Sequence, residues 1–482
     1  MFEFTVETIA GATGASVVAG DPARICRGCF IDSRLVERDG LFVAFSGERV
    51  DGNDFAPQAV SAGAAAVVLT RTPDDALLEQ ADAAGCAVLV ADDAQEFLLR
   101  LAHVYRAELA CTVVGVTGSI GKTTTKDFLA ALLGARFRVW ATKGNYNNLI
   151  GLPLSILSAP RDTQVLVLEM GMNAWGEIER LAACAEPSLA VITKVGTSHI
   201  GMLGSRENIA RAKAEIVSGM RPVPSGSEAG VPGAAPVLVL SGEDDFTPFI
   251  RDEFALPAAV EVVLAGTGAD DEVRASNIEL DVEGHPSFDL LLASGESARI
   301  TLAVTGAQSV SNAVLAAALA ERLGIDAATM EAAFKRLAIT GRRQELRRAA
   351  CGARVIDDTY NASPESTAAA LDLLEMLPVS GRRIAVLGEI GELGEEGPRL
   401  HALVGSYAAA KKPDLLVCVG TACAEEMAAA ARLMGMPARS VAIAGDTERA
   451  TELVRQSLRS DDTLLVKGSR FLGLDRLVEE VC

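Results

Sequence analysis

The sequence is poor in aromatic residues and has no long apolar segment. Only 4% of its 482 residues are Phe, Trp or Tyr, and no run reaches the ~18 apolar residues of a membrane-spanning helix. The first residues, Met1–Glu7, are acidic and lack the basic start and apolar stretch of a signal peptide. These absences argue against a membrane span, and we expect a cytoplasmic protein.

Basic residues are scarce relative to acidic ones. The 44 Lys and Arg stand against 64 Asp and Glu, a net charge of −20. A nucleic-acid-binding protein would show a basic face, so this composition disfavours that class. Small anionic substrates remain compatible with it, because local lysines and arginines can reverse the field inside a cleft. The length and the 49% apolar content indicate a globular protein of several domains.

The nine cysteines are scattered and odd in number, as is typical of a reducing compartment. Cys26 and Cys29 form the only C-x-x-C pair in the sequence. Because a zinc site of this kind needs a second pair, we interpret both as buried or incidental residues.

Short apolar runs alternate with helical patterns, which is the signature of parallel sheets covered by helices. We expect three α/β domains, at residues 1–108, 109–339 and 340–482. The third resembles a dinucleotide-binding fold but lacks G-x-G-x-x-G after its first strand, so nothing indicates NAD. Residues 221–236, rich in Pro and Gly, are expected to form a surface loop. The predicted strands are Leu41–Phe45, Ala64–Leu69, Cys86–Ala91, Thr112–Val116, Val165–Leu168, Leu189–Thr193, Ala353–Ile356, Arg383–Leu387, Leu415–Val419 and Thr463–Val466.

A glycine-rich segment joins the predicted strand Thr112–Val116 to a helical pattern. Strand, glycine loop, Lys-Thr and helix form the layout of a phosphate-binding loop, in which Lys122 reaches the terminal phosphates and Thr123 can hold Mg²⁺. The usual motif has glycine six residues before the lysine, where this chain has Val116. The segment therefore predicts a nucleoside triphosphate site with unusual spacing. Its residues are Thr117, Gly118, Ser119, Ile120, Gly121, Lys122, Thr123 and Thr124.

Three further side chains of the second block are candidates. Glu169 ends a strand where P-loop enzymes place an acidic metal ligand, although an ordinary strand-end glutamate is an equal alternative. His199 follows the next strand, and a lone histidine is more often structural than a ligand. Lys213 lies in a clear helical pattern, for which a solvated lysine is the simpler interpretation. Because the carboxyl ends of parallel strands meet at one edge, we expect Glu169 and His199 near the phosphate loop.

A cluster of asparagines follows the first helix of this block. Asn145, Asn147 and Asn148 surround Tyr146. Such a cluster can be turn chemistry, and it also provides amide donors and acceptors for a polar substrate.

Two adjacent acids, Asp357 and Asp358, come where a strand leaves the core of the third block. They can bind a ribose or cap the next helix. We favour binding, because Arg342 and Arg343 lie upstream and can bind phosphates in a bidentate manner.

Taken together, these segments resemble the Mur ligase family, and specifically its MurF type, over nearly the whole chain. The family's loop reads Thr-Gly-x-x-Gly-Lys-Thr, which matches Thr117 to Thr123 and removes the anomaly at Val116. The most type-specific matches are residues 144–148 with 150–153, and residues 357–362. Supporting matches are Asp32-Ser33-Arg34, Leu41-Phe42-Val43-Ala44, Asp51-Gly52, Leu387-Gly388 with Glu392-Leu393-Gly394, and Lys467-Gly468-Ser469-Arg470.

The resemblance implies an ATP site with Mg²⁺, two ions being expected. Lys122 would bind the β- and γ-phosphates, and Thr123, Glu169 and His199 would hold metal ions. Lys213 would be the family's carbamylated lysine, whose carbamate supports the second metal ion. The remaining ATP contacts would come from Asn312, Arg342 and Asp358.

The same resemblance implies the substrates, UDP-N-acetylmuramoyl-tripeptide and D-alanyl-D-alanine. Ser33 and Arg34 would lie in an N-terminal pocket for the uridine nucleotide. The tripeptide carboxylate would attack the γ-phosphate of ATP, and the dipeptide amine would then attack the acyl phosphate. This is a step in peptidoglycan synthesis, on which cell shape and division depend. The other expected substrate contacts are Asn145, Asn147, Asn148, Tyr360 and Asn361.

Departures and alternatives remain at this point. Gln308 and Ser309 stand where the family often has His-Asn, and Asn53, Ser363 and Glu389 replace other frequent residues. A different Mur ligase or a folylpolyglutamate synthase, with another amine, is the rival enzyme. A non-catalytic nucleotide-gated protein is the rival from another class. We expect a monomer whose third domain closes about a hinge near residue 340.

Overall fold

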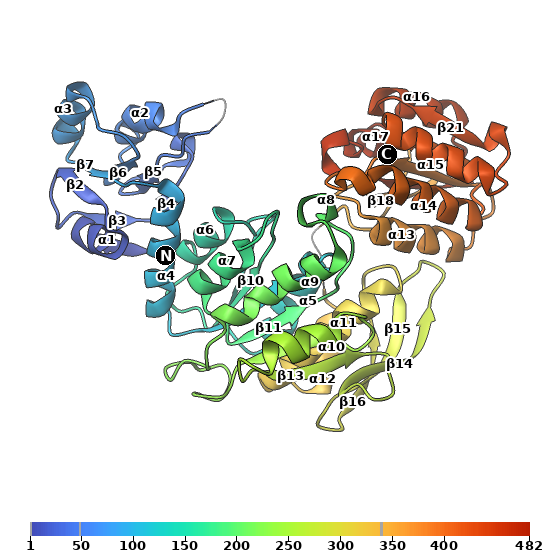
Figure 1. Ribbon diagram of the computed structural model, residues 1–482, viewed down its shortest axis with the longest axis horizontal. Helices are drawn as coiled ribbons and strands as arrows, with labels where there is room; N and C mark the ends of the chain where they lie inside the picture. The colour runs from blue at the N-terminus through green and yellow to red at the C-terminus, as the bar shows by residue number, and fades with distance from the viewer. Residues whose placement is uncertain (1, 48–49, 338–340) are drawn as a thin grey trace.

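The computed structural model describes residues 2–47, 50–337 and 341–482, and these residues fold into three α/β units, as predicted. The middle unit lies between the N-terminal unit and the C-terminal unit (Figure 1). The predicted boundary at residues 339 and 340, and the residue 340 hinge, lie outside the described residues. Each predicted strand is confirmed, with small shifts at its ends, and residues 221–236 contain neither helix nor strand.

The N-terminal unit is built on a sheet of order β2-β7-β6-β5-β4, beside the antiparallel pair β1 and β3. All sheet neighbours are parallel except β2 and β7. Cys26 is buried in β3, and burial raises the pKa of its thiol to about 12. The strands are β1 (Glu3–Thr5), β2 (Ser16–Ala19), β3 (Ile25–Arg27), β4 (Cys29–Phe30), β5 (Leu41–Val43), β6 (Ala66–Leu69) and β7 (Ala87–Val90), and the helices are α1 (Val6–Thr13), α2 (Ala56–Ser61), α3 (Asp75–Ala84) and α4 (Ala94–Glu108).

The middle unit contains a sheet of order β16-β15-β14-β13-β12-β11-β8-β10-β9. Strands β8 to β13 are parallel, and every residue of β8 and β10 is buried, because helices cover both faces. These strands are β8 (Thr112–Thr117), β9 (Val139–Ala141), β10 (Val165–Glu169), β11 (Leu189–Ile192), β12 (Val237–Ser241) and β13 (Glu261–Gly266). The helices are α5 (Lys122–Gly134), α6 (Gly151–Leu157), α7 (Glu177–Ala185), α8 (Ile200–Leu203), α9 (Arg206–Ala214), α10 (Thr247–Ile250), α11 (Gln308–Arg322) and α12 (Ala327–Phe334).

The sheet continues through β14 (Val273–Leu280), which is parallel to β13, and then through an antiparallel extension of β15 (Pro286–Leu291) and β16 (Ser297–Thr301). The strands predicted above do not include it. Strand β16 forms one edge of the sheet (Figure 1). Arg299 on this edge pairs with Glu279 and Asp289 on the two neighbouring strands.

The C-terminal unit has a sheet of order β17-β18-β22-β19-β20-β21 that is parallel except for β17. Asp357 and Asp358, expected where a strand leaves the core, are the last two residues of β18 and are buried. The strands are β17 (Glu345–Arg348), β18 (Arg354–Asp358), β19 (Arg383–Gly388), β20 (Leu415–Val419), β21 (Val441–Ala444) and β22 (Thr463–Lys467), and the helices are α13 (Pro364–Met376), α14 (Gly397–Ala410), α15 (Ala422–Leu433), α16 (Thr447–Ser457) and α17 (Asp475–Val481).

Candidate active site

The phosphate loop leaves the carboxyl end of β8 and enters α5. Gly118 has φ +144°, and a Cβ there would lie 1.9 Å from the Thr193 hydroxyl oxygen. Gly121 has φ +87°, and a Cβ there would lie 2.2 Å from Asn312 Oδ1. A side chain is excluded at both positions by backbone conformation and by space. Val116, in contrast, is a buried residue of β8, which explains physically why no glycine is needed there.

Polar atoms of this loop are buried without partners. The hydroxyl oxygens of Thr117 and Ser119 make no hydrogen bond within the described part of the chain. The Lys122 ammonium donates to the Gly118 carbonyl at 2.7 Å, and Ile120 and Thr124 are half-buried beside it. Unsatisfied buried hydroxyls are costly, and the N-terminus of α5 favours negative charge. The loop therefore fits the phosphates of ATP.

Thr123 and Glu169 meet directly at the start of α5. The Thr123 hydroxyl donates to Glu169 Oε2 at 2.8 Å, and Asn147 Nδ2 donates to Glu169 Oε1 at 2.7 Å. Glu169 is 2% exposed. A hydroxyl and a carboxylate are hard oxygen donors of the kind Mg²⁺ prefers. No three His, Cys, Asp or Glu side chains gather as a metal site in the residues described, so the fit rests on these two groups together with phosphate oxygens.

Lys213 is buried on α9 and 1% exposed. Burial lowers the pKa of its amine well below the ordinary value, and the positive charge of Lys122 lowers it further. Burial also lowers the pKa of Lys122, with Glu169 opposing this shift. The solvated lysine suggested by residue pattern alone is therefore wrong, and Lys213 favours the neutral amine.

His199 contacts the C-terminal unit rather than Glu169 in this structure. Its Nδ1 lies 2.6 Å from Glu392 Oε2, and this contact lowers the pKa of the Glu392 carboxyl. His199 adopts φ +66° immediately before α8, a conformation uncommon for a residue with a side chain. The Gly201 amide donates to the Glu392 carbonyl at 3.0 Å. His199 thus sits at the junction of the two units.

The two adjacent arginines take different positions. Arg342 pairs with Asp475 at 2.5 Å and with Glu479 at 2.8 Å, both on α17. Arg343 donates to the Thr123 hydroxyl at 2.9 Å, and its guanidinium lies 4.0 Å from the centre of the Tyr360 ring. The structure therefore brings Arg343 to the phosphate loop, whereas the family resemblance implies an ATP contact for Arg342. The adjacent arginine pair was the available signal, but it did not distinguish the two.

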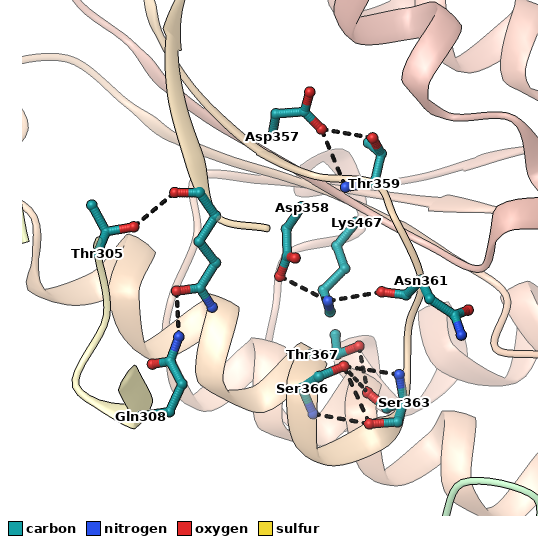
Figure 2. Close-up of polar contacts among 11 residues, drawn as sticks. Thr305, Gln308, Asp357, Asp358, Thr359, Asn361, Ser363, Ser366, Thr367 and Lys467 are labelled. Carbon is teal, nitrogen blue, oxygen red and sulfur yellow. Dashed lines mark hydrogen bonds and ion pairs between the residues drawn. The ribbon is translucent and has the colours of Figure 1, made fainter. Parts of the chain in front are cut away.

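Asp358 pairs with Lys467 across the neighbouring strands β18 and β22 (Figure 2). The Lys467 ammonium donates to Asp358 Oδ2 at 2.7 Å and to the Asn361 carbonyl at 3.1 Å. Lys467 is 2% exposed. The neighbouring Asp357 accepts from the Thr359 hydroxyl at 2.6 Å. Neither acid caps the next helix.

Ser363 caps α13 instead, in a reciprocal capping box with Ser366 (Figure 2). The Ser363 and Ser366 hydroxyls accept from each other's backbone amides at 3.2 Å and 2.9 Å. Serine at this position thus serves as the N-cap where the family often has asparagine, which is also favoured at N-caps. It also fixes the first turn of α13.

Gln308 and Asn312 lie near the start of α11, close to the C-terminal unit. Gln308 donates to the side-chain oxygen of Gln344, and the Thr305 hydroxyl donates to the Gln344 carbonyl at 2.7 Å. Figure 2 shows Thr305 and Gln308 on the middle-unit side of this contact. Asn312 Oδ1 lies against Gly121 and 3.4 Å from the Thr125 hydroxyl. Gln308 therefore links two units, and the Ser309 hydroxyl donates locally to the Gly306 carbonyl at 2.6 Å.

A cleft of about 400 Å³ opens on the C-terminal unit beside Tyr360. The Arg470 guanidinium lies 5.9 Å from the Tyr360 ring centre, and Asn361 is exposed nearby in the chain. Arginine side chains suit carboxylates and phosphates. The lining residues are Arg342, Thr359, Tyr360, Arg470, Gly473, Asp475 and Arg476.

Of the asparagine cluster, Asn147 alone contacts a predicted site residue, Glu169, among the described contacts. Asn148 Oδ1 accepts from the amides of Ile150 and Gly151 at 3.2 Å and 2.8 Å, which is turn chemistry at the start of α6. Asn145 is exposed. Turn formation therefore applies to Asn148, whereas Asn147 is placed beside a predicted site residue.

In the N-terminal unit, Ser33 is buried and donates to Gln58 Oε1 at 2.8 Å. Arg34 is largely exposed and pairs with Asp32 at 2.6 Å. Asn53 is buried, and its amide nitrogen donates to Asp51 at 2.7 Å. The N-terminal unit lies beside the middle unit and apart from the C-terminal unit (Figure 1).

Comparisons with known proteins identify the class. Family models match the chain at residues 26–106 (Mur ligase family, catalytic domain), 116–320 (Mur ligase middle domain) and 342–470 (Mur ligase, glutamate ligase domain). The chain belongs to the Mur ligase family.

The relatives and solved structures it resembles are of one type within that family. UDP-N-acetylmuramoyl-tripeptide–D-alanyl-D-alanine ligase of Bacillus subtilis is 35% identical, with 95% of this chain and 93% of the relative covered. The Escherichia coli ligase of the same name is 30% identical over 93% and 92%. MurF from Acinetobacter baumannii has TM-score 0.86 at 29% identity over 99% and 98%, and MurF from Thermotoga maritima in complex with ADP has TM-score 0.77 at 26% identity over 94% and 96%.

Proposed function

We propose that this chain is the ADP-forming ligase that joins UDP-N-acetylmuramoyl-tripeptide to D-alanyl-D-alanine, a step in peptidoglycan precursor synthesis. The names of its relatives support this assignment. The observation that carries the chemistry is the meeting of Thr123, Glu169 and Arg343 at the mouth of a glycine loop. It joins an ATP-binding element of the middle unit to a cation of the C-terminal unit.

The first step brings two anions together, since the tripeptide carboxylate attacks the γ-phosphate and ADP leaves. Two unit charges of like sign 4 Å apart repel by about 4 kcal/mol at an effective dielectric of 20. Lys122 and Arg343 supply positive charge beside the loop. Mg²⁺, when bound, would neutralise phosphate charge, and Thr123 and Glu169 are placed to hold it. The dipeptide amine then attacks the acyl carbon, losing a proton as phosphate leaves.

Lys213 is proposed to be carbamylated in the working enzyme. A carbamate forms from a neutral amine and CO₂, and the lowered pKa of the buried Lys213 supports that form at neutral pH. We expect Lys213→Ala to lose activity, small carboxylic acids to restore part of it, and bicarbonate to have no effect. Full activity of the variant would contradict the carbamate role.

The substrate sites are proposed from separate features. The cleft beside Tyr360 offers Arg470 and Arg476 to an anionic group, as the carboxylate of the dipeptide would require. Ser33 and Arg34 are proposed to bind the uridine nucleotide. Asn147 is proposed to contact the substrate in the middle unit, between the uridine pocket and the cleft beside Tyr360. The roles that the family resemblance implies stay predictions for the remaining residues, which are His199, Asn145, Asn148, Asn312, Arg342, Asp358 and Asn361.

The three units are proposed to act as domains 1–108, 109–339 and 340–482 of a cytoplasmic monomer, the C-terminal one closing on ATP. In the described chain, no helix has both the length and the apolar character to cross a bilayer. Residues expected to contact ATP lie on both the middle and the C-terminal unit. ATP binding would therefore favour closure of the cleft between them, which would shield the acyl phosphate from water. Small-angle scattering should show smaller dimensions with an ATP analogue plus the uridine substrate. Unchanged dimensions would count against closure.

Phosphate release from ATP in the presence of UDP-N-acetylmuramoyl-tripeptide tests the function. Release should depend on D-alanyl-D-alanine and be weak with single amino acids. Release that ignores the dipeptide would favour a ligase with another amine. No release with any amine would favour a non-catalytic nucleotide-binding protein.

A further inference from the structure

The segment between β11 and α8 backs the phosphate loop. The Lys194 carbonyl accepts from the Ser119 amide at 2.7 Å, and the Ser198 hydroxyl donates to the Ser119 carbonyl at 3.4 Å. The Thr193 hydroxyl donates to the Thr117 carbonyl at 3.3 Å and also to the Ile120 carbonyl. Residues 193–198, which we call the backing segment, therefore determine where the loop backbone lies.

The C-terminal unit holds this backing segment through Glu365. Glu365 Oε1 accepts from the Thr197 amide at 2.7 Å. A Cβ at the neighbouring Gly196 would lie 2.9 Å from the same oxygen, so a side chain there would have to displace the Glu365 carboxylate. Glu365 is in the first turn of α13, which the Ser363 capping box and Pro364 fix (Figure 2). A rigid helix end thus presents one carboxylate to the segment behind the ATP site.

Within the described residues, hydrogen bonds satisfy only one oxygen of the Glu365 carboxylate, although its charge, after the larger effect of Asp245, also helps to raise the pKa of the nearby Arg206. The second Glu365 oxygen, Oε2, and the Thr197 hydroxyl are both buried without a partner in the residues described. A buried carboxylate oxygen with no donor is unfavourable. Glu365 therefore bridges the two units through a hydrogen bond, at a segment that also contacts the phosphate loop.

We propose that Glu365 is a positioning residue for the ligase reaction. When the C-terminal unit docks, Glu365 fixes Thr197, and the backing segment in turn holds the phosphate loop in the arrangement that binds ATP. This inference rests on the proposed function for its kinetic part only. The hydrogen bond itself can be tested without substrates.

Hydrogen exchange of the nucleotide-free protein tests the contact. Glu365→Ala should speed exchange at the Thr197 amide by about tenfold or more, as expected for the loss of a charge-assisted hydrogen bond. Gly196→Ala, made in the other unit, should act in the same direction by displacing the carboxylate. Glu375→Ala is the matched control, because Glu375 lies in the last turn of α13 and pairs with Lys411. Wild-type exchange at Thr197 in both test variants would overturn the proposal.

Kinetics distinguish positioning from a general structural role. Glu365→Ala should lower kcat/KM for ATP by about tenfold with little change in KM for the uridine substrate. Glu365→Gln keeps an oxygen that accepts from the Thr197 amide, and should stay within about threefold of wild type. Equal losses in the Gln and Ala variants, or equal losses toward both substrates, would overturn it. If the wild-type protein shows no ligase activity, the proposed function fails, while the exchange result still judges the contact.

Discussion

The middle and C-terminal sheets are both parallel over most of their strands. They differ in which polar groups lie at the carboxyl ends of those strands. The middle unit uses backbone groups, since glycines at 118 and 121 let the chain between β8 and α5 fold into a cradle. The C-terminal unit uses side chains, with Asp358 and Lys467 paired at the ends of β18 and β22. Sheets of one fold class can thus place polar groups at this edge in two ways. One way uses a local loop, and the other uses side chains that are distant in sequence.

The largest effect, on the free energy of unfolding, should come from breaking the Asp358–Lys467 ion pair of the C-terminal sheet. Lys467→Met leaves the buried Asp358 carboxylate without its cation and should cost about 3–5 kcal/mol of unfolding free energy. The double variant Asp358→Asn/Lys467→Met should recover part of this, because no unpaired charge remains. Urea unfolding followed by circular dichroism measures both. A double variant as unstable as the single one would contradict the ion-pair explanation.

Removing the lysine side chain that serves the glycine loop of the middle unit should affect activity rather than stability. Lys122→Ala removes the cation of the phosphate loop and should lower kcat for phosphate release by about 10²–10³-fold. Lys335→Ala is the control, since Lys335 is exposed and pairs only with Glu331 among its described contacts. Comparable loss in both variants would show that general charge, and not the loop, is responsible.

A smaller effect with a defined pH dependence should come from Lys213→Met in buffer free of metal ions and CO₂. The lowered pKa of the buried amine means that the unfolded chain binds a proton that the folded chain lacks, up to its ordinary pKa near 10.5. Wild-type stability should therefore rise with pH over this window. The Met variant lacks this term, so its Tm should exceed that of wild type by a few degrees near neutral pH. The difference should shrink as pH rises, and thermal unfolding at several pH values measures it.

The smallest effect compares the two neighbouring arginines. Arg343→Ala loses the contacts with Thr123 and Tyr360 and should lower kcat/KM for ATP by about tenfold. Arg342→Ala loses pairs with Asp475 and Glu479 on α17 and should change kcat/KM less. Steady-state kinetics with ATP varied decides between them. The reverse order would return the ATP contact to Arg342.

The strands that the sequence predicted are continuous apolar runs buried over most of their length, although the equally buried β12 was not predicted. Strand β15 was missed because it is not a run of this kind. Its residues alternate between buried and half-buried, since it lies in the antiparallel extension near the edge of the sheet. The phosphate loop could also be predicted, because its glycines and Lys122 are contiguous and their conformations are local.

Long-range pairing explains the misses at the site. Nothing local shows that Lys213 is buried, because its helix also carries exposed charges such as Glu207 and Arg211. Likewise, Arg342 takes φ +63°, and this irregular backbone sends Arg342 and Arg343 to different partners. Residues 342 and 343 lie outside the helices and strands, so no regular periodicity of side-chain directions could predict their partners. The family resemblance supplied Lys213, but it did not indicate Arg343.

The edge strand β16 has a consequence for the concentrated protein. An edge strand exposes backbone groups that another molecule's strand can pair with. Arg299 and its partners Glu279 and Asp289 are substantially exposed, so they add little to folding stability. A strand that paired with β16 would nevertheless have to remove water from the Arg299 guanidinium on the edge strand itself. We therefore expect Arg299 to disfavour pairing between molecules at this edge, which lies at the end of the sheet opposite β9.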